Sequence, residues 1–390
     1  MKTVTLPVAY MPLVDAAPLI VAQEMGFAET EGIALDLIAA PSWSSVRDML
    51  AFGRVDAAHM LSLVPVAMAL GLGGVSTPVS AVMVTSVNGD VIGVNRALEA
   101  RLRAQGYGFD FSDPRTAARA LALAADGPLV FGVPFPFSMH VELLHYWFDG
   151  TDLAGAKVTI RTVPPPLMAE ALAAGDINAF CVGEPWGSVA VDQGAGALLL
   201  PANAIWAFAP EKVLAVRTDW AETEPLLLRR LMRAVWRADQ WLARSDTHTT
   251  AAEILSRKTY LDMPAELIDR ALRGRFTISC RAEQREVARF IEFHHGAASF
   301  PWRSQAKWMA SRLALRHGLD TSDSMARAAA TYRSDLFRAH MPVEVDLPGA
   351  SEKIEGAILR ETAVASQKGR LTLLADSFFD GCIFDPDATG

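Results

Sequence analysis

Short apolar segments alternate with helix-like segments over the first 90 residues, and this alternation restricts the folds open to the chain. Strand patterns are predicted for residues 4–10, 33–39, 55–60 and 79–85. Helix patterns are predicted between them, for residues 15–25, 42–52 and 63–70. Strands that alternate with helices of this length are typical of a parallel or mostly parallel α/β sheet.

An internal repeat indicates that this design occurs twice. The run Leu50-Ala-Phe-Gly-Arg-Val-Asp-Ala57 resembles Leu172-Ala-Ala-Gly-Asp-Ile-Asn-Ala179. In both runs a helix ends at a glycine, which tolerates the positive φ of a helix C-terminus, and the chain then enters a short apolar strand. The repeat therefore predicts two α/β lobes of similar construction.

The rest of the chain is predicted to complete the first lobe. We expect lobe 1 to comprise residues 1–90 and 208–390, and lobe 2 to comprise residues 91–207. Two crossings between the lobes would make a hinge. Apolar positions at helical spacing follow from residue 227 to residue 242, and further helices are predicted for residues 281–293, 305–315 and 322–340. The expected fold is thus α/β and two-lobed, with a helical C-terminal extension.

Composition and charge narrow the class of protein. The chain has 390 residues, 51% of them apolar and 21% charged, which is typical of a globular protein. Its formal net charge of -8 disfavours direct nucleic-acid binding, since phosphate contacts need a basic surface. The sequence contains no run of about 18 apolar residues, so no membrane span is predicted. A strand pattern starts at residue 4 without a preceding export-signal pattern, so we expect a cytoplasmic protein.

The three cysteines agree with that location. Cys181, Cys280 and Cys382 are far apart and odd in number. Buried free thiols in a reducing compartment are the plainest interpretation.

Enzyme signatures are missing from the sequence. It contains no GxSxG, Walker A, HExxH or CxxC motif. The histidine pairs His140/His145 and His294/His295 lack the i, i+4 spacing that aims two imidazoles at one metal. We therefore predict a binding protein with no catalytic residues, no cofactor and no metal site.

Four segments offer the donors that a small oxyanion needs. The run Pro41-Ser-Trp43 leads into a helix, whose free amides and dipole attract an anion, and the Trp43 indole adds an N–H. His140 lies in the first turn of another helix, and Gly183 precedes a third. Lys212 supplies a positive charge.

Each of these residues also has a purely structural interpretation. Trp43 could be a packing residue and His140 a core histidine with satisfied hydrogen bonds. Gly183 could serve only a turn, and Lys212 could be a solvated surface lysine. Spacing and composition alone leave both interpretations open.

The same segments resemble a known family over nearly the whole chain. The strongest is Phe180-Cys-Val-Gly-Glu-Pro-Trp186, and further stretches lie at residues 9–13, 41–43, 56–60, 88–89, 135–136, 210–212, 300–304 and 378–381. Together they resemble the nitrate- and bicarbonate-binding proteins of ABC importers, the NrtA/CmpA group. This resemblance implies a periplasmic-binding-protein-like fold of type II and a small-anion ligand, nitrate or nitrite.

Position by position, the resemblance places the ligand contacts of the family on Trp43, His140, Gly183 and Lys212. The fifth contact of the family is a glutamine that follows Asn-Gly, and here that position holds Asp90. An ionised aspartate cannot donate to an anion and repels it. Asp90 therefore either pairs with Lys212, or turns away, or indicates a ligand other than nitrate.

The expected absence of an export signal favours one branch of this resemblance. Full-length members without a signal resemble the cytoplasmic nitrate/nitrite sensors of the NasS type, whose partner is a NasT-type RNA-binding antiterminator protein. The alternatives are the solute-binding component of an ABC importer and a thiamine-biosynthesis enzyme on the same fold. The cysteine-rich motif of that enzyme group has no counterpart in this sequence.

Overall fold

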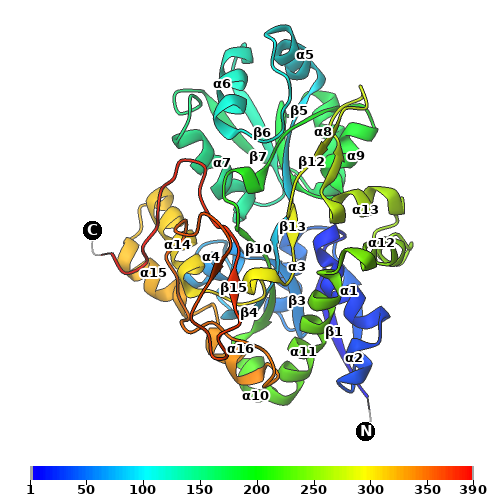
Figure 1. Cartoon of the computed structure of the whole chain (residues 1–390), viewed down its shortest axis with the longest axis vertical. Helices are drawn as coiled ribbons and strands as arrows, with labels where there is room; N and C mark the ends of the chain where they lie inside the picture. Colours follow the sequence, from blue (N-terminus) through cyan, green and yellow to red (C-terminus); the bar gives the residue numbers. More distant parts are fainter. Residues whose placement is uncertain (1–2, 389–390) are drawn as a thin grey trace.

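The computed structural model describes residues 3–388 and contains two α/β lobes, one above the other in Figure 1. The central sheet of lobe 1 has the strand order β13-β4-β10-β3-β1-β2. Strand β1 is parallel to β2 and β3, whereas β10 runs antiparallel to both β3 and β4. The six strands are β1 (Val4–Tyr10), β2 (Ile33–Ala39), β3 (Ala57–Leu61), β4 (Val79–Asn88), β10 (Pro210–Arg217) and β13 (Ile291–Glu292).

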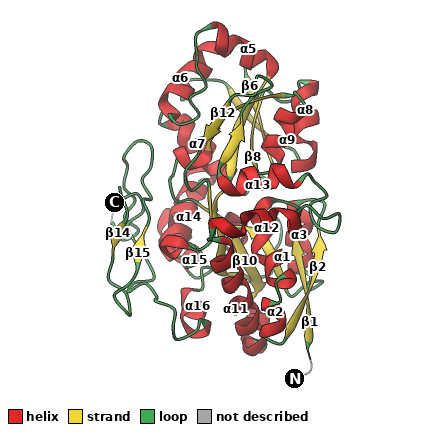
Figure 2. Cartoon of the chain, turned by 45° about the vertical axis from the view of Figure 1, so that its right-hand side comes forward, coloured by secondary structure: helices red, strands yellow, loops and turns green. Residues whose placement is uncertain are grey.

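The central strands β3, β4 and β10 are buried along almost their whole length, because helices pack on both faces of this sheet. Figure 2 shows the helices in front of and behind the strands. They are α1 (Ala17–Glu24), α2 (Phe27–Thr30), α3 (Trp43–Ala51), α4 (Leu63–Ala69), α10 (Thr218–Thr223) and α11 (Pro225–Leu242).

Lobe 2 repeats the same design around a five-stranded sheet of order β7-β6-β8-β5-β9. Its strands are β5 (Asp90–Asn95), β6 (Leu129–Val133), β7 (Val158–Thr162), β8 (Ala179–Gly183) and β9 (Gly196–Pro201). Its helices are α5 (Arg96–Ala104), α6 (Pro114–Ala124), α7 (Met139–Asp149), α8 (Met168–Ala174) and α9 (Trp186–Asp192). The two lobes expected from the repeat are present.

The C-terminal part is helical for most of its length and then ends in a turn-rich tail, which Figure 1 shows in red beside lobe 1. Its elements are α12 (His248–Leu255), α13 (Ala265–Arg273), β11 (Arg275–Thr277), β12 (Gln284–Glu286), α14 (Arg303–His317), α15 (Thr321–Ala329), α16 (Ser334–His340), β14 (Thr362–Ala363) and β15 (Thr372–Leu373).

One of the predicted C-terminal helices is wrong, and another is divided in two. Residues 281–293 form β12 and β13 with turns at Ala282 and Arg289, which have φ of 60° and 53°. Pairing of β12 with β11 and of β13 with β4 overrides the local helix pattern. The predicted helix 322–340 is broken between α15 and α16, because the backbone of Thr331 bonds to Ala81 and the Tyr332 hydroxyl donates to the Ser62 carbonyl.

The hairpin β11–β12 reaches lobe 2 although the chain on either side of it belongs to lobe 1. Leu198 of β9 donates its backbone N–H to the carbonyl of Ile278 at 2.8 Å, and Arg285 donates to the carbonyl of Phe109. The chain therefore passes between the lobes here as well as at the two predicted crossings. The lobe boundaries at residues 90 and 208 stay a prediction.

The expectation of three buried free thiols is only partly correct. All three cysteines are free, and Cys181 is buried, but Cys280 and Cys382 are exposed. No helix among residues 3–388 is long and apolar enough to cross a membrane.

Candidate functional site

The ends of central strands bring the predicted site residues to the junction of the lobes. Lys212 lies in β10 of lobe 1, and Trp43 is the first residue of α3. Asp90 begins β5 and is paired with Gly183, the last residue of β8. His140 is the second residue of α7. Since strand ends and helix starts meet here, the site sits at the switch between lobes, where α/β proteins commonly bind ligands.

All five predicted residues belong to one connected cluster. Lys212 Nζ lies 5.6 Å from the centre of the Trp43 ring. His140 Nε2 lies 3.0 Å from Asp90 Oδ1. A β-carbon added to Gly183 would lie 3.4 Å from the same Asp90 oxygen and only 2.8 Å from Leu13 Cδ2, so a side chain here would require Leu13 to move. The geometry brings the residues together, and their role as ligand contacts stays a prediction.

Lys212 is fully buried and bonded to two carboxylates. Its Nζ lies 2.8 Å from Asp15 Oδ2 and 2.7 Å from Glu211 Oε1. Burial acts to lower the pKa of Lys212, but Asp15, Glu211 and Asp90 outweigh it and raise that pKa above its usual value. The interpretation of Lys212 as a solvated surface lysine is therefore excluded, and its charge is fixed inside the protein.

Asp15 and His59 are site residues that the sequence did not single out. Asp15 Oδ1 lies 3.1 Å from His59 Nε2, and both side chains are buried. Burial raises the pKa of Asp15, but Lys212 and His59 outweigh it and lower the value to about 2. Burial lowers the pKa of His59. His59 lies within the segment 56–60 that carried the family resemblance, and Asp15 follows the segment 9–13. Their pairing joins residues far apart in the sequence, so no local sequence pattern predicts it.

Asp90 does not pair with Lys212 directly. It faces His140, whose other ring nitrogen Nδ1 lies 3.4 Å from Glu211 Oε1. Burial raises the pKa of Asp90, and His140 and Lys212 outweigh it, so the pKa is lowered overall. Burial and the neighbouring Asp90 raise the pKa of Glu211 well above its usual value. The position of the family glutamine is thus occupied by an ionised carboxylate that faces an imidazole.

The indole Nε1 of Trp43 and the hydroxyl of Ser86 are buried donors of this cluster that make no hydrogen bond within the described part of the chain. The ring nitrogens of His140 and the Nε2 of His59 lie 3.0–3.4 Å from carboxylate oxygens, so these nitrogens have partners nearby. Ser86 is the cross-strand partner of Lys212, so their side chains lie on the same face of the sheet. Buried donors without partners are costly, and a bound ligand is one way to satisfy them. Ser86 is not among the residues predicted from the sequence.

Three side chains of the cluster come close enough for a shared cation. Ligand atoms of Asp90, His140 and Glu211 lie within 4.8 Å of one another. However, the Lys212 ammonium is only 2.7 Å from Glu211 and would repel a metal ion there. We therefore interpret the three residues as part of a polar network around Lys212.

The lobes touch each other beside this cluster. The backbone N–H of Val14 donates to the carbonyl of Glu184 at 2.9 Å, and the Trp186 indole donates to the carbonyl of Pro12 at 3.1 Å. Residues 12–15 of lobe 1 are therefore bonded to the segment after β8 in lobe 2. This is a closed arrangement, in which the cluster is shielded from solvent.

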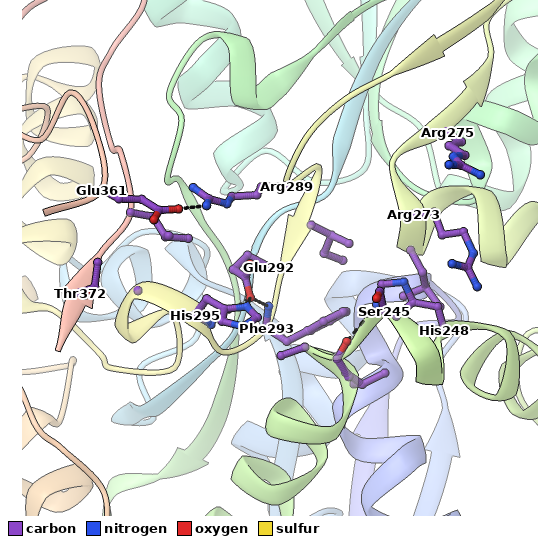
Figure 3. A pocket seen from close by; sticks show the side chains of 16 residues that line it. Ser245, His248, Arg273, Arg275, Arg289, Glu292, Phe293, His295, Glu361 and Thr372 are labelled. Atoms are coloured by element: carbon purple, nitrogen blue, oxygen red, sulfur yellow. Dashed lines mark hydrogen bonds and ion pairs between the residues drawn. The ribbon is translucent and has the colours of Figure 1, made fainter. Parts of the chain in front are cut away.

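A separate pocket of about 590 Å³ contains none of the predicted site residues (Figure 3). It is lined by α11, α12, the segments around β11 and β13, and the tail. Its three arginines are already paired, Arg273 with Asp269, Arg275 with Glu286 and Arg289 with Glu361. Lys212 is paired with carboxylates too, so charge alone does not distinguish the pocket from the cluster. The cluster is the better candidate because it contains all of the predicted site residues.

Known proteins of similar sequence and structure share this two-lobed arrangement. The chain is 27% identical over 395 residues to the nitrate/nitrite binding protein NrtA of Nostoc, covering 99% of this chain and 84% of that one. It superimposes on the crystal structure of the periplasmic nitrate-binding protein NrtA from Synechocystis with a TM-score of 0.83 and 26% identity, covering 99% and 96% of the two chains. The predicted two-lobed, type II binding-protein fold is therefore confirmed.

A longer relative matches over only part of its length. The nitrate import ATP-binding protein NrtC of Synechocystis is 31% identical over 318 residues, which are 80% of this chain but 46% of that protein. This chain thus spans about half of the length of NrtC. The relatives matched over most of their length are named as binding proteins, which confirms the expectation that the chain is not an enzyme.

A match to a protein-family model identifies the family of the chain. It covers residues 1–256, which include every residue of the cluster described above. The chain belongs to the NMT1-like family.

Proposed function

We propose that the protein binds a small inorganic oxyanion, nitrate or nitrite, at the buried cluster between its lobes. The observation that carries the proposal is the convergence of the Trp43 indole, the His140 imidazole and the Lys212 ammonium in one buried cluster with unused donors. The ligands named for the NrtA relatives support the same class of anion.

Ligand binding would favour closure because the donors come from both lobes. Trp43 and Lys212 belong to lobe 1, whereas His140 and Gly183 belong to lobe 2. An anion that bridges them binds the closed form better than the open form, and it shifts the equilibrium only by that difference in affinity. A shift from mostly open to mostly closed requires about 10⁴-fold discrimination.

The biological role that the comparisons favour is the solute-binding component of an importer for nitrate or a related anion. The chain matches binding proteins of this kind over 84% and 96% of their length. The change in shape on closure would then present the loaded protein to a membrane permease.

A cytoplasmic sensor that controls a NasT-type antiterminator is the second candidate. Its support is the resemblance to NasS-type sensors and the formal net charge of -8, which suits a protein that leaves RNA contacts to a partner. In this role, closure around the ligand would release the partner protein instead of engaging a permease.

Titration calorimetry with nitrate, nitrite and bicarbonate tests the ligand. We expect binding of nitrate or nitrite by the wild-type protein and loss of binding in Lys212→Met. The matched control is Lys353→Met, since Lys353 is another buried lysine, paired with Glu355 at 3.0 Å and Asp376 at 2.7 Å. Equal affinity in Lys212→Met and the wild type would contradict the proposal.

The role is tested separately by mixing the protein with a NasT-type antiterminator. A complex that forms without nitrate and dissociates when nitrate is added would support the sensor. Restored uptake of labelled nitrate, in a strain that lacks only its nitrate-binding component, would support the importer.

A further inference from the structure

We propose that Asp90 couples anion binding at the buried cluster to the uptake of one proton for each anion bound. The inference rests on the proposed function, because it concerns the anion held by the same cluster. It explains how a site built around carboxylates accepts a negatively charged ligand.

The positive charge of Lys212 is compensated by the carboxyl groups beside it. The Nζ of Lys212 lies 2.8 Å from Asp15 and 2.7 Å from Glu211, and no part of its side chain is exposed. His59, on the far side of Asp15, is buried and has a lowered pKa, so it is neutral near pH 7. A second anion that entered with no proton would therefore add uncompensated negative charge to a dry site.

Charged and titratable groups approach Asp90 from every side. They are His140 on α7, Glu211 and Lys212 on β10, Cys181 on β8, Glu184 after β8 and Asp15 in the segment before α1. Burial raises the pKa values of Glu211 and of the Cys181 thiol well above their usual ranges, so these two groups are uncharged near pH 7. Burial raises the pKa of Glu184 to about 7. The groups that meet an entering anion most directly are therefore Asp15, Asp90, Lys212 and the His140 imidazole.

Asp90 is the member of this set that is placed to receive the proton. Its Oδ1 lies 3.0 Å from His140 Nε2, and ligand atoms of Asp90, His140 and Glu211 lie within 4.8 Å of one another. Both oxygens of Asp90 are buried, and neither makes a well-aligned hydrogen bond among residues 3–388. A proton taken from solvent forms an O–H bond at Oδ2 and removes one negative charge. The carboxylic acid then donates a hydrogen bond to the anion, as the amide of the family glutamine would.

Proton uptake has a direct consequence for affinity. Asp90 is ionised in the free protein, because His140 and Lys212 outweigh the effect of burial and lower its pKa. Nearby negative charge raises that pKa once the anion is bound. Between the two pKa values, the dissociation constant rises about tenfold for each unit of pH, as linkage requires for one proton.

The test is calorimetry with nitrate and nitrite between pH 5.5 and 8.5, in pairs of buffers with different ionisation enthalpies. We expect uptake of close to one proton per anion by the wild type. Asp90→Asn has the same size and a permanent donor, so it should bind at pH 8.5 with little proton uptake and a flat pH profile. Asp239→Asn is the matched control, because Asp239 is also a buried carboxyl group, but it is bonded to Ser299.

An infrared difference spectrum on nitrate binding adds an independent readout. A carboxylic-acid C=O band should appear in the wild type and in Asp239→Asn, and be missing from Asp90→Asn. Circular dichroism establishes that each variant is folded.

Binding with a flat pH profile in the wild type would overturn the proton inference alone. So would a steep profile that persists in Asp90→Asn, or wild-type binding that depends on an added divalent cation instead of on pH. No binding by the wild type and Asp90→Asn at every pH would contradict the proposed function itself.

Discussion

The ammonium of Lys212 lies 2.8 Å from the carboxylate of Asp15, deep between the two lobes, and this contact neutralises the one lysine of the predicted anion site. The Asp15 carboxylate thus occupies a position beside the Lys212 ammonium to which a bound anion would also be attracted. An anion that binds at this cluster must therefore share the ammonium with Asp15 or displace it.

The Asp15–Lys212 pair makes stability depend on pH in the acid range. The pKa of Asp15 is lowered from 3.8 to about 2, so its contribution is present above pH 4 and is lost as the pH falls through about 2. The shift corresponds to about 2 kcal/mol of unfolding free energy. Urea unfolding at pH 6 and near pH 2 should show this loss in the wild type and not in Asp15→Asn. Asp126→Asn, at an exposed carboxylate, is the control.

Replacing Trp43 by phenylalanine should separate hydrogen bonding from packing. Trp43 is 2% exposed, and its indole N–H has no partner among the described residues. Loss of that donor should weaken nitrate binding about tenfold, the value of one hydrogen bond of about 1.4 kcal/mol. Trp206→Phe is the matched control, since Trp206 Nε1 is also buried without a partner but its ring stacks on Phe378. Equal weakening in both variants would show that the effect is not local to the site.

Glu142 should make the contact between α7 and α14 sensitive to pH near neutrality. Its carboxylate is buried and pairs with Arg316 across the two helices. Burial raises the pKa of Glu142 from 4.5 to about 7, with Arg316 opposing the shift. Because the pKa is higher in the folded than in the unfolded protein, protonated Glu142 stabilises the fold fully below pH 4.5. This contribution to the unfolding free energy is lost as the pH rises to about 7, by about 3 kcal/mol at most.

Thermal unfolding measured at pH 5 and pH 8 tests this expectation. The wild type should lose more stability between these two pH values than Glu142→Gln, which cannot ionise. The same pH dependence in the two proteins would assign it to another group.

Phe378 should hold the tail onto the connection between the lobes. Its ring stacks on Trp206 at 4.7 Å and on Trp308 at 5.7 Å, and it is almost fully buried. Truncation of a large buried aromatic typically costs about 3–5 kcal/mol. Phe378→Ala should therefore lower the unfolding free energy by about that amount and leave the nitrate affinity of the folded protein within about twofold. Chemical denaturation together with calorimetry measures the two effects.

Local patterns were sufficient to predict several helices and strands of the first lobe. The strand at residues 4–10, the helix closed by Gly53 and the helix 305–315 all depend on periodicity and on glycine at the helix end, which are properties of neighbouring residues. The pattern failed at residues 281–293, where pairing with strands distant in the sequence decides the structure.

The candidate site was predicted only as far as its family motifs extend. Trp43, His140, Gly183, Lys212 and Asp90 come together as expected. Asp15 and Ser86 could not be singled out, because their importance depends on side chains brought to Lys212 from elsewhere in the fold. The partner of Asp90 could not be predicted from the sequence either. A pair with Lys212 was one of the alternatives, but in the structure Asp90 faces His140.

The most direct measurement is a crystal structure of the protein grown with nitrate at a pH where calorimetry detects binding. We expect a planar anion between the lobes, within hydrogen-bond distance of Trp43 Nε1 and Lys212 Nζ, with the protonated Asp90 donating a hydrogen bond to it from Oδ2. An empty cleft at saturating nitrate, or an anion bound in the arginine-lined pocket of Figure 3 instead, would contradict it.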